Sequence, residues 1–465
     1  MLQFQPNMQS SLRYLLFTGL LLLSFFSTTT LSAQCEDTNG GTLTFGSGNF
    51  EETIFVDGEA DVLSFQTDAE VLPNQYVYII TDANDIILNV ADGTGVDFDP
   101  AGIGNCRIYG LAYTNNTFIF PGFALDQIPL ASGCFELSSN YLVVRRISPQ
   151  QVSNNVFVSS NTQAKVAKVD ILADGNLMQT SFDVAAEDAD GIFYDNSSDV
   201  LYQLNRTDNV IDIYSNASTM PTLVASSTSD FSNGREISVS GNKLIVAQDA
   251  NDGNDNQNRL IIYDITTTSI TLDRIFDVEI NLWGIQANSN QLIAIVDNSS
   301  EVAVFNNIFN REAGDLVPNQ VVTIENMIRT HGLNYDAAED VLYLTDVGAA
   351  SSPNDGALVS VENWMTASMD GMVTAAEQGR AEGAASLLGN PVDIAIDRVN
   401  RTVFVAERAN GGGRILGFKM PIITGGIAPF YQRVWAGASA VHIPGTEVPL
   451  DICGFIEGGR VTLED

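Results

Sequence analysis

The sequence predicts an all-β protein in which a β-sandwich-like module is followed by a six-bladed β-propeller that a C-terminal strand closes. Short apolar strands alternate with turns rich in Gly, Asn and Asp along nearly the whole chain. After residue 150 a strand-turn-strand pattern recurs with a period of ~40 to 50 residues, which is typical of propeller blades. Apolar residues make up 45% of the chain and charged residues only 17%, which is enough to form large cores.

The chain is strongly acidic. It has 57 Asp and Glu residues against 21 Lys and Arg residues, which gives a formal net charge of −36 over 465 residues. This charge repels phosphate groups, so nucleic acid and anionic membrane surfaces are excluded as partners. Most of the acidic residues fall in turns and blade loops, where they favour solubility.

The first 33 residues have the pattern of a secretory signal peptide. Arg13 precedes an apolar run over residues 14–26, and a Thr-rich stretch then leads to the small residues Ser32 and Ala33. The apolar run is shorter than the ~20 residues that span a bilayer. We therefore expect cleavage after Ala33 and export, to the extracellular space, the cell surface or the periplasm.

Cysteine usage agrees with export. All four cysteines follow residue 33, and an oxidising compartment allows disulfides with three possible pairings. We expect Cys35 to pair with Cys134, because this bond ties the first and last strands of the module. Cys106 and Cys453 are then free or paired across the two domains. The chain has no CxxC and only two histidines, which argues against a structural zinc site.

Residues 34–148 form the expected sandwich-like module. Alternating strands are predicted over residues 42–45, 62–65, 76–80 and 141–144, and nothing between them has a helical period of useful length.

Five stretches of this module follow one another in a specific order: Cys35 with Gly40 and Gly41, then residues 56–61, 79–88, 97–110 and 133–140. On these residues the module resembles a recurrent extracellular module of bacterial surface proteins. That family usually has a further cysteine before the second stretch, where this chain has Phe55. The resemblance implies a surface location and no enzymatic chemistry.

Residues 149–450 repeat one pattern, in which a small or acidic residue opens a strand, a turn follows, and a second strand ends in polar residues. Five such pairs occur, over residues 191–195 with 200–204, 236–239 with 244–247, 284–287 with 292–297, 332–336 with 341–346, and 393–397 with 402–407. Third strands are predicted over residues 210–214, 260–263, 302–305 and 415–418. Each unit is therefore predicted to be one multi-stranded blade.

The strands at the two ends of the repeat region are predicted to form one sheet. Residues 155–158 and 166–170 have the pattern of second and third strands without a first, and residues 440–443 follow the last full unit at the expected spacing. We expect a sixth sheet built from this C-terminal strand and the strands near 155–182, which pairs an otherwise exposed edge. Residues 367–388 are expected to be an insertion without strands, with a short helix over one face. Residues 451–465 are expected to be a tail.

The clearest copy of the repeat is HGLNYDAAEDVLYLTD at residues 331–346. On this pattern the region resembles six-bladed propellers of the gluconolactonase and NHL-repeat kind, over roughly two thirds of the chain. The resemblance implies an architecture, because such folds host unrelated functions. Enzymes of the gluconolactonase kind hold a metal with Glu, Asn and Asp side chains, and only Glu236 and Asp393 are suggestive of that set.

The residues before and at the start of each inner strand are expected to face a shared funnel at the end of the central tunnel. The candidate ligand-binding residues of this funnel are Asp190, Arg235, Glu236, Trp283, His331 and Asp393. The carboxylates of Asp190, Glu236 and Asp393 suit a hard cation such as calcium. A cation there would polarise a lactone or ester carbonyl, with His331 or a carboxylate as general base.

A structural interpretation of the same residues is stronger. Strand ends are hydrated and collect polar groups, Arg235 neutralises neighbouring carboxylates, and glycine openers allow close backbone approach. The sequence has no GxSxG, HExxH, phosphate-loop or dinucleotide motif. The leading hypothesis is therefore a secreted or cell-surface binding protein whose propeller face binds a small molecule, a glycan or a protein. The alternative is a calcium-dependent lactonase or esterase.

Overall fold

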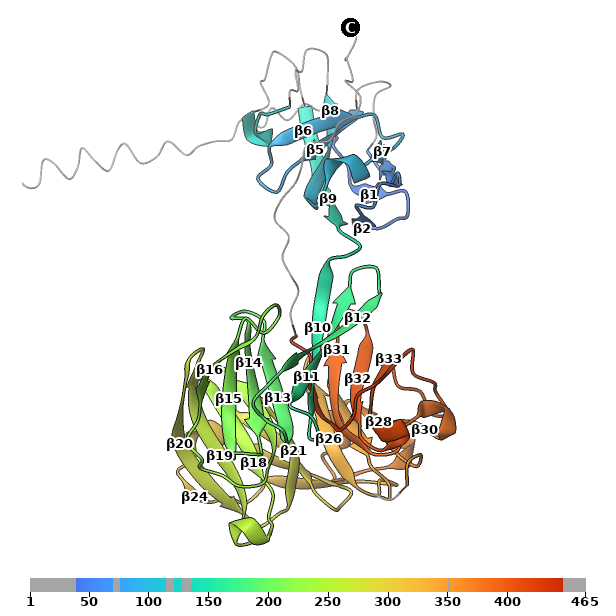
Figure 1. Ribbon diagram of the computed structural model, residues 1–465. Helices are drawn as coiled ribbons and strands as arrows, with labels where there is room; N and C mark the ends of the chain where they lie inside the picture. The colour runs from blue at the N-terminus through green and yellow to red at the C-terminus, as the bar shows by residue number, and fades with distance from the viewer. Residues whose placement is uncertain (1–38, 70–75, 114–120, 128–134, 350–351, 446–465) are drawn as a thin grey trace, which may run out of the picture. The chain divides into compact units, whose positions relative to one another are not determined.

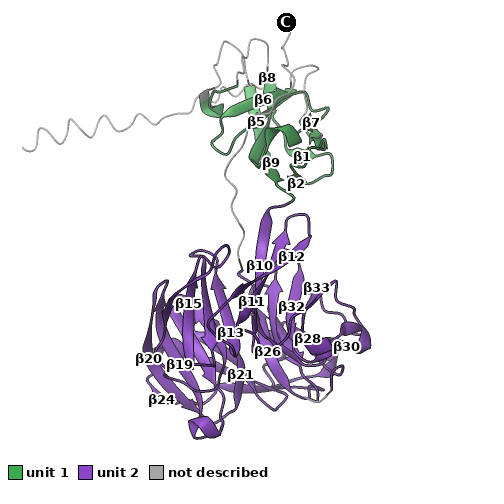
Figure 2. Cartoon of the chain, viewed as in Figure 1, with its two compact units in different colours: residues 1–149, 450–465 green, residues 150–449 purple. Residues whose placement is uncertain are grey.

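The computed structural model describes residues 39–69, 76–113, 121–127, 135–349 and 352–445. The chain forms two compact units, one of residues 1–149 with 450–465 and the other of residues 150–449 (Figure 2). The expected signal peptide, the expected tail and three of the cysteines, Cys35, Cys134 and Cys453, lie outside the described residues. No helix within the described ranges is long and apolar enough to cross a membrane.

The first unit is built on a five-stranded sheet with two short β-ribbons. In the sheet β2 runs parallel to β9, and all other neighbours are antiparallel. The sheet order is β2 (Glu51–Phe55), β9 (Phe135–Ile147), β8 (Gly104–Tyr113), β5 (Tyr76–Thr81) and β6 (Ile87–Ala91), and the ribbons pair β1 (Leu43–Phe45) with β4 (Phe65–Thr67) and β3 (Val62–Leu63) with β7 (Val96–Asp97).

Strand β5 shows how the sheet of this unit buries both of its faces. Successive side chains of a strand point to opposite faces, so Tyr78 and Ile80 pack into one core with Phe65 of β4, and Val77 and Ile79 pack into another. The all-β, sandwich-like prediction for this region is confirmed.

Cys106 is the one cysteine within the described residues. Its side chain is fully buried in β8, and it is disulfide-bonded. Of the two states expected for Cys106, free or paired, the free state is therefore excluded. Its partner lies outside the described residues, so the pairing of Cys35 with Cys134 stays a prediction.

The second unit is a ring of six sheets, each a blade of four or five strands. Figure 1 shows the blades following one another from the green strands β13–β16 to the orange strands β31–β33, with β10, β11 and β12 between the two ends. From the inner strand outward, the blades are β35 (Ala438–His442), β10 (Val152–Ser160), β11 (Lys165–Leu172), β12 (Leu177–Asp183); β13 (Ala189–Asp195), β14 (Val200–Asn205), β15 (Val210–Ser215), β16 (Thr222–Ser226); β17 (Gly234–Ser240), β18 (Lys243–Gln248), β19 (Asn258–Thr266), β20 (Ser269–Val278), β24 (Gly314–Asp315); β21 (Leu282–Asn288), β22 (Gln291–Val296), β23 (Glu301–Asn306), β25 (Gln320–Ile324), β29 (Met372–Val373); β26 (Thr330–Asp336), β27 (Val341–Asp346), β28 (Ala357–Glu362), β30 (Gln378–Glu382); and β31 (Pro391–Asp397), β32 (Thr402–Glu407), β33 (Arg414–Lys419), β34 (Tyr431–Val434).

The second strand of each blade explains the apolar runs of the sequence. Strands β14, β27 and β32 are buried along their whole length, because neighbouring blades cover both of their faces. The outermost strands β16 and β34 are mostly exposed and more polar. The propeller core therefore lies between blades, on their second and third strands.

The ring closes as the sequence predicts. Strand β35 pairs antiparallel with β10, with Phe157 opposite His442 and Val158 opposite Val441. Side chains strengthen the closure, since the Ser159 and Ser439 hydroxyls lie 2.9 Å apart. The C-terminal strand therefore provides the inner strand of the first blade and removes its exposed edge.

The expectation of a strandless insertion over residues 367–388 is wrong. Residues Gln378–Glu382 form β30, the outermost strand of the fifth blade, and Met372–Val373 form β29 at the edge of the fourth. The α-helix here is only the single turn α2 (Trp364–Ala367). β30 has no apolar alternation because only Ala381 of its five residues is buried.

Candidate functional site

The six inner strands converge on a narrow central tunnel. They contact one another in the order β35, β13, β17, β21, β26 and β31, and β31 returns to β35. A Cβ atom added to Gly284 would lie 2.3 Å from the carbonyl oxygen of His331, and one added to Gly332 would lie 2.5 Å from the Cα atom of Asp393. These glycines are therefore required by close backbone approach, as the structural interpretation expected.

The three predicted carboxyl groups meet inside this tunnel. Asp190, Glu236 and Asp393 are only 4%, 8% and 7% exposed. Strands β17 and β31 are three places apart around the ring in either direction, so Glu236 and Asp393 enter the tunnel from opposite sides. The amide of Ile237 donates to Oε1 of Glu236 at 2.8 Å, and the amide of Val441 donates to Oδ2 of Asp393 at 2.7 Å.

Burial keeps these carboxyl groups protonated to a higher pH than usual. It raises the pKa of Asp393 to about 8 and that of Asp190 to about 7. Burial, and then the charge of Asp393, also raise the pKa of Glu236 well above its usual value. Asp393 thus holds its proton near neutral pH, and Glu236 holds its proton to a higher pH than an ordinary Glu.

This arrangement does not support the expected calcium site. Within the described ranges, no group of three His, Cys, Asp or Glu side chains is placed to hold a metal ion. Calcium sites in proteins usually include ionised carboxylates, whereas burial in the tunnel favours the neutral acids. The charge of Asp190 also raises the pKa of Glu236 and Asp393, so the three carboxyl groups lie near one another, and burial favours their neutral forms.

The other three predicted residues form a stack at the tunnel end. Arg235, Trp283 and His331 come from successive inner strands, β17, β21 and β26. The Arg235 guanidinium carbon lies 4.2 Å from the centre of the Trp283 ring. The Trp283 and His331 rings are parallel within 7°, with centroids 3.8 Å apart. A cation–π contact and an aromatic stack therefore connect the inner strands of three neighbouring blades.

His331 is poorly placed to act as a general base. Its side chain is 3% exposed, and its Nε2 atom lies 3.2 Å from Oδ1 of Asp297. Burial lowers the pKa of His331, although the nearby Asp297 carboxylate raises it. The ring is thus kept neutral, stacked on Trp283 and shielded from substrate.

The charge partners of the funnel are only partly those expected, because Arg235 lowers the pKa of Asp190 through its charge but forms its ion pair elsewhere. Arg235 donates through Nη2 to Oδ2 of Asp249 at 3.1 Å, rather than to the tunnel carboxyl groups. The cation nearest to Asp190 is Arg206, whose Nη1 atom lies 3.6 Å from Oδ2 of Asp190 and 3.2 Å from Oδ1 of Asp188. Arg206 follows the end of a second strand, so the spacing of the inner-strand openers did not reveal it.

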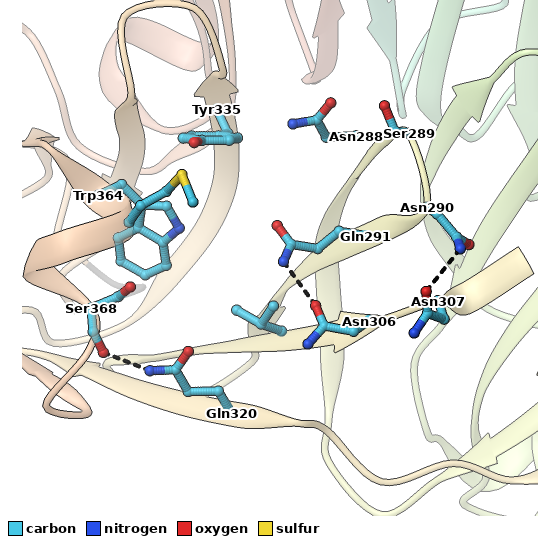
Figure 3. A pocket seen from close by; sticks show the side chains of 12 residues that line it. Asn288, Ser289, Asn290, Gln291, Asn306, Asn307, Gln320, Tyr335, Trp364 and Ser368 are labelled. Carbon is cyan, nitrogen blue, oxygen red and sulfur yellow. Dashed lines mark hydrogen bonds between the residues drawn. The ribbon is translucent and has the colours of Figure 1, made fainter.

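An open cavity of about 650 Å³ lies at the far end of β21, between the fourth and fifth blades. Figure 3 shows side chains from several elements converging on it. We call it the amide cavity; it is lined by Asn288, Ser289, Asn290, Gln291, Val304, Asn306, Asn307, Gln320, Tyr335, Trp364, Met365 and Ser368.

Hydrogen bonds orient the side-chain amides of this cavity. Gln291 Nε2 donates to Asn306 Oδ1 at 2.9 Å, and Asn290 Nδ2 donates to Asn307 Oδ1 at 3.1 Å (Figure 3). Gln320 Nε2 donates to the carbonyl oxygen of Ser368 at 2.6 Å. The lining contains no Asp, Glu, His, Lys or Arg, so it is uncharged at neutral pH.

Sequence reasoning missed the amide cavity. Its residues come from the turn between β21 and β22, from the end of β23, from β25 and from α2. Each of these segments, taken alone, has the composition of a hydrated loop or blade edge. The available signal was the Asn and Gln enrichment of residues 288–291 and 306–307, which becomes meaningful only when the blades are assembled.

No protein-family model matches this chain, and no curated protein matches it. Among solved structures, a nidogen/laminin complex is similar over 62% of this chain and 98% of that chain, with 13% identity and a TM-score of 0.45. A putative 6-phosphogluconolactonase from Bacteroides fragilis is similar over 63% and 98%, with 11% identity and a TM-score of 0.44. One from Bacteroides uniformis covers 63% and 100%, with 10% identity and a TM-score of 0.45. Similarity at this level says nothing about the activity or partners of this chain.

Proposed function

We propose that this chain is an exported binding protein, secreted or held at the cell surface, whose propeller carries the ligand site. One observation carries the proposal: the candidate reactive groups of the funnel are buried, and the amide cavity, which is open, has no carboxyl, imidazole, amine or thiol group in its lining. The carboxyl groups of Glu236 and Asp393 and the imidazole of His331 are buried in or beside the tunnel. The amide cavity is lined by amide, hydroxyl, aromatic and aliphatic side chains.

Binding is favoured over hydrolysis for a chemical reason. A general base must reach the proton that it removes, directly or through one water. His331 is buried and stacked, and the buried Asp393 keeps its proton near neutral pH. In the amide cavity the most acidic side-chain group is the phenol of Tyr335, and burial raises its pKa to about 12. Neither place supplies an accessible base.

The export part of the proposal is supported by the sequence of residues 1–33 and by the disulfide-bonded Cys106. Mass spectrometry of the protein isolated from the cells that make it tests this part. We expect a mature N-terminus at Gln34 in the envelope or medium fraction. An intact N-terminus on protein in the cytoplasmic fraction would contradict export.

The binding part is tested by turnover. The purified full chain is incubated with a panel of lactones and aryl esters, with and without calcium chloride, beside a Glu236→Gln variant. We expect no turnover above the buffer rate and no change in unfolding temperature with calcium. Turnover that Glu236→Gln abolishes would overturn the proposal and restore the hydrolase hypothesis.

A further inference from the structure

We infer that the amide cavity is a binding site for an uncharged carbohydrate, such as the end of a neutral glycan chain. This inference deepens the proposed binding function and rests on it. The cavity of about 650 Å³ falls within the ~300 to 1,000 Å³ that is usual for small-molecule sites. It combines many hydrogen-bonding groups with aromatic surface and contains no charge.

The polar groups of the cavity match those of a sugar. Each sugar hydroxyl both donates and accepts a hydrogen bond, and a primary amide offers both functions on one planar group. Side-chain amides that line the cavity are Asn288, Asn290, Gln291, Asn306, Asn307 and Gln320. Carboxylates accept only and ammonium groups donate only, so an amide lining suits hydroxyl groups better than it suits ions.

The amides are preorganised and still have capacity for a ligand. The contact between Gln291 and Asn306 uses the amino group of Gln291 and the carbonyl of Asn306. Within the described residues this leaves the carbonyl of Gln291 and the amino group of Asn306 available as an acceptor and donor pair. Because neighbouring side chains fix these groups, a ligand loses less conformational entropy from the protein on binding.

Aromatic side chains form the other side of the cavity. Figure 3 shows Tyr335 and Trp364 across the cavity from Gln291 and Asn306. The Tyr335 hydroxyl donates to Asp340 at 2.9 Å, and the Trp364 side chain is held in the core between two blades. Both rings are therefore rigid. Trp364 and Tyr335 are only 4% and 8% exposed, so the small apolar area that they leave open contacts a C–H face of the sugar, while the amides bind its hydroxyl edge.

Other classes of ligand fit less well. An anion would meet no cation in the lining, and the net charge of −36 would repel it. A metal or organic cation would meet no carboxylate. An apolar ligand would desolvate the amides without giving them hydrogen bonds. An uncharged peptide offers amides of its own, but it lacks the ring of hydroxyls that would use several amides at once.

Isothermal titration calorimetry on the purified full chain tests the inference. The probes are methyl glycosides and neutral oligosaccharides of glucose, galactose, mannose and N-acetylglucosamine, with oligouronates and a neutral Gly-Ser peptide for comparison. The test variant carries Gln291→Ala and Asn306→Ala. Its matched control is Asn242→Ala, which changes the equivalent turn of the neighbouring blade outside the cavity. Unfolding temperatures verify that both variants are folded.

We expect at least one neutral saccharide to bind the wild-type chain and the Asn242→Ala control equally. The double variant should bind that saccharide at least about tenfold more weakly, because it loses two hydrogen-bonding groups. The inference is overturned if no neutral saccharide binds, if the double variant binds as well as the control, or if the uronates or the peptide bind more tightly. Those results would not contradict the proposed binding function. That function is contradicted by turnover of lactones or esters, or by an unprocessed chain in the cytoplasm.

Discussion

The two ends of strand β21 face very different surroundings. Trp283, near its start, is stacked between a guanidinium and an imidazole beside a tunnel of buried acids. Asn288, its last residue, lines an open cavity without charge. The inner strands crowd together at the tunnel, so titratable groups there are shielded from water. The charged residues of the tunnel are therefore buried and support the fold, whereas the accessible lining of the amide cavity is neutral.

The strongest test of crowding at the tunnel is Gly332→Ala. The added methyl group would lie 2.5 Å from the Cα atom of Asp393, on backbone that cannot move without shifting a neighbouring blade. We expect the free energy of unfolding to fall by about 3 kcal/mol. Urea unfolding measures it, with the exposed Gly426→Ala as control, where the nearest atom is 3.8 Å away. Equal effects in the two variants would show that the inner strands are not tightly packed.

A smaller loss is expected from Arg235→Gln. The Arg235 and Asp249 side chains are 16% and 12% exposed, so the substitution leaves a mostly buried carboxylate without its cation. The free energy of unfolding should fall by about 2 kcal/mol. The control is Arg259→Gln in β19 of the same blade. The side chains of Arg259 and its partner Asp277 are 30% and 53% exposed, so their ion pair should contribute less than about 1 kcal/mol. Similar losses would contradict a structural role for the stack.

The buried acids predict a dependence of stability on pH. The pKa of Asp393 is raised to about 8 in the folded chain, whereas an unfolded Asp titrates near ~3.9. The native state therefore binds more protons between these values, and this group contributes stability at low pH that is lost as pH rises toward 8.

Asp393→Asn removes this contribution. Its amide oxygen can still accept from Val441, so we expect the variant to fold. Between pH 5 and 7, its free energy of unfolding should rise relative to wild type by about 1.4 kcal/mol per pH unit. Denaturant unfolding of both chains at several pH values measures this difference. The surface carboxylates are the same in both chains, so their contribution to the pH dependence cancels. A difference that does not change with pH would show that Asp393 is ionised in the tunnel.

The smallest effect is expected at the amide cavity. Gln291 is half-buried and bonds through its side chain to the exposed Asn306. Gln291→Ala should change the free energy of unfolding by less than about 0.5 kcal/mol, as should Asn242→Ala. Thermal unfolding of both variants checks this. A loss above about 1.5 kcal/mol in Gln291→Ala alone would indicate that the amides serve the fold rather than a ligand.

The repeat period was sufficient to predict the ring. The same spacing led to β35 as the closing strand. Each opener is the third residue of an inner strand: Gly191, Glu236, Gly284, Gly332 and Asp393. Outer strands were harder, because exposure removes the apolar alternation that reveals a strand. Residues 378–382 pair along the whole of β30 but bury only one side chain.

The candidate site was predictable only in part. Equivalent positions in successive repeats predicted that Asp190, Glu236 and Asp393 would meet. Their protonation depends on how completely the neighbouring blades exclude water, which no local pattern encodes. The partner of Asp190, Arg206, and the amide cavity come from positions that do not repeat between blades. These features exist only once the blades are assembled.

A calorimetric titration that compares the tunnel with the amide cavity shows which of the two binds a ligand. The neutral saccharide that binds best to the wild-type chain is titrated into Asp393→Asn and into the Gln291→Ala, Asn306→Ala double variant. We expect unchanged affinity for the tunnel variant and at least about tenfold weaker binding for the cavity variant. Weakened binding in the tunnel variant with full affinity in the cavity variant would contradict this expectation.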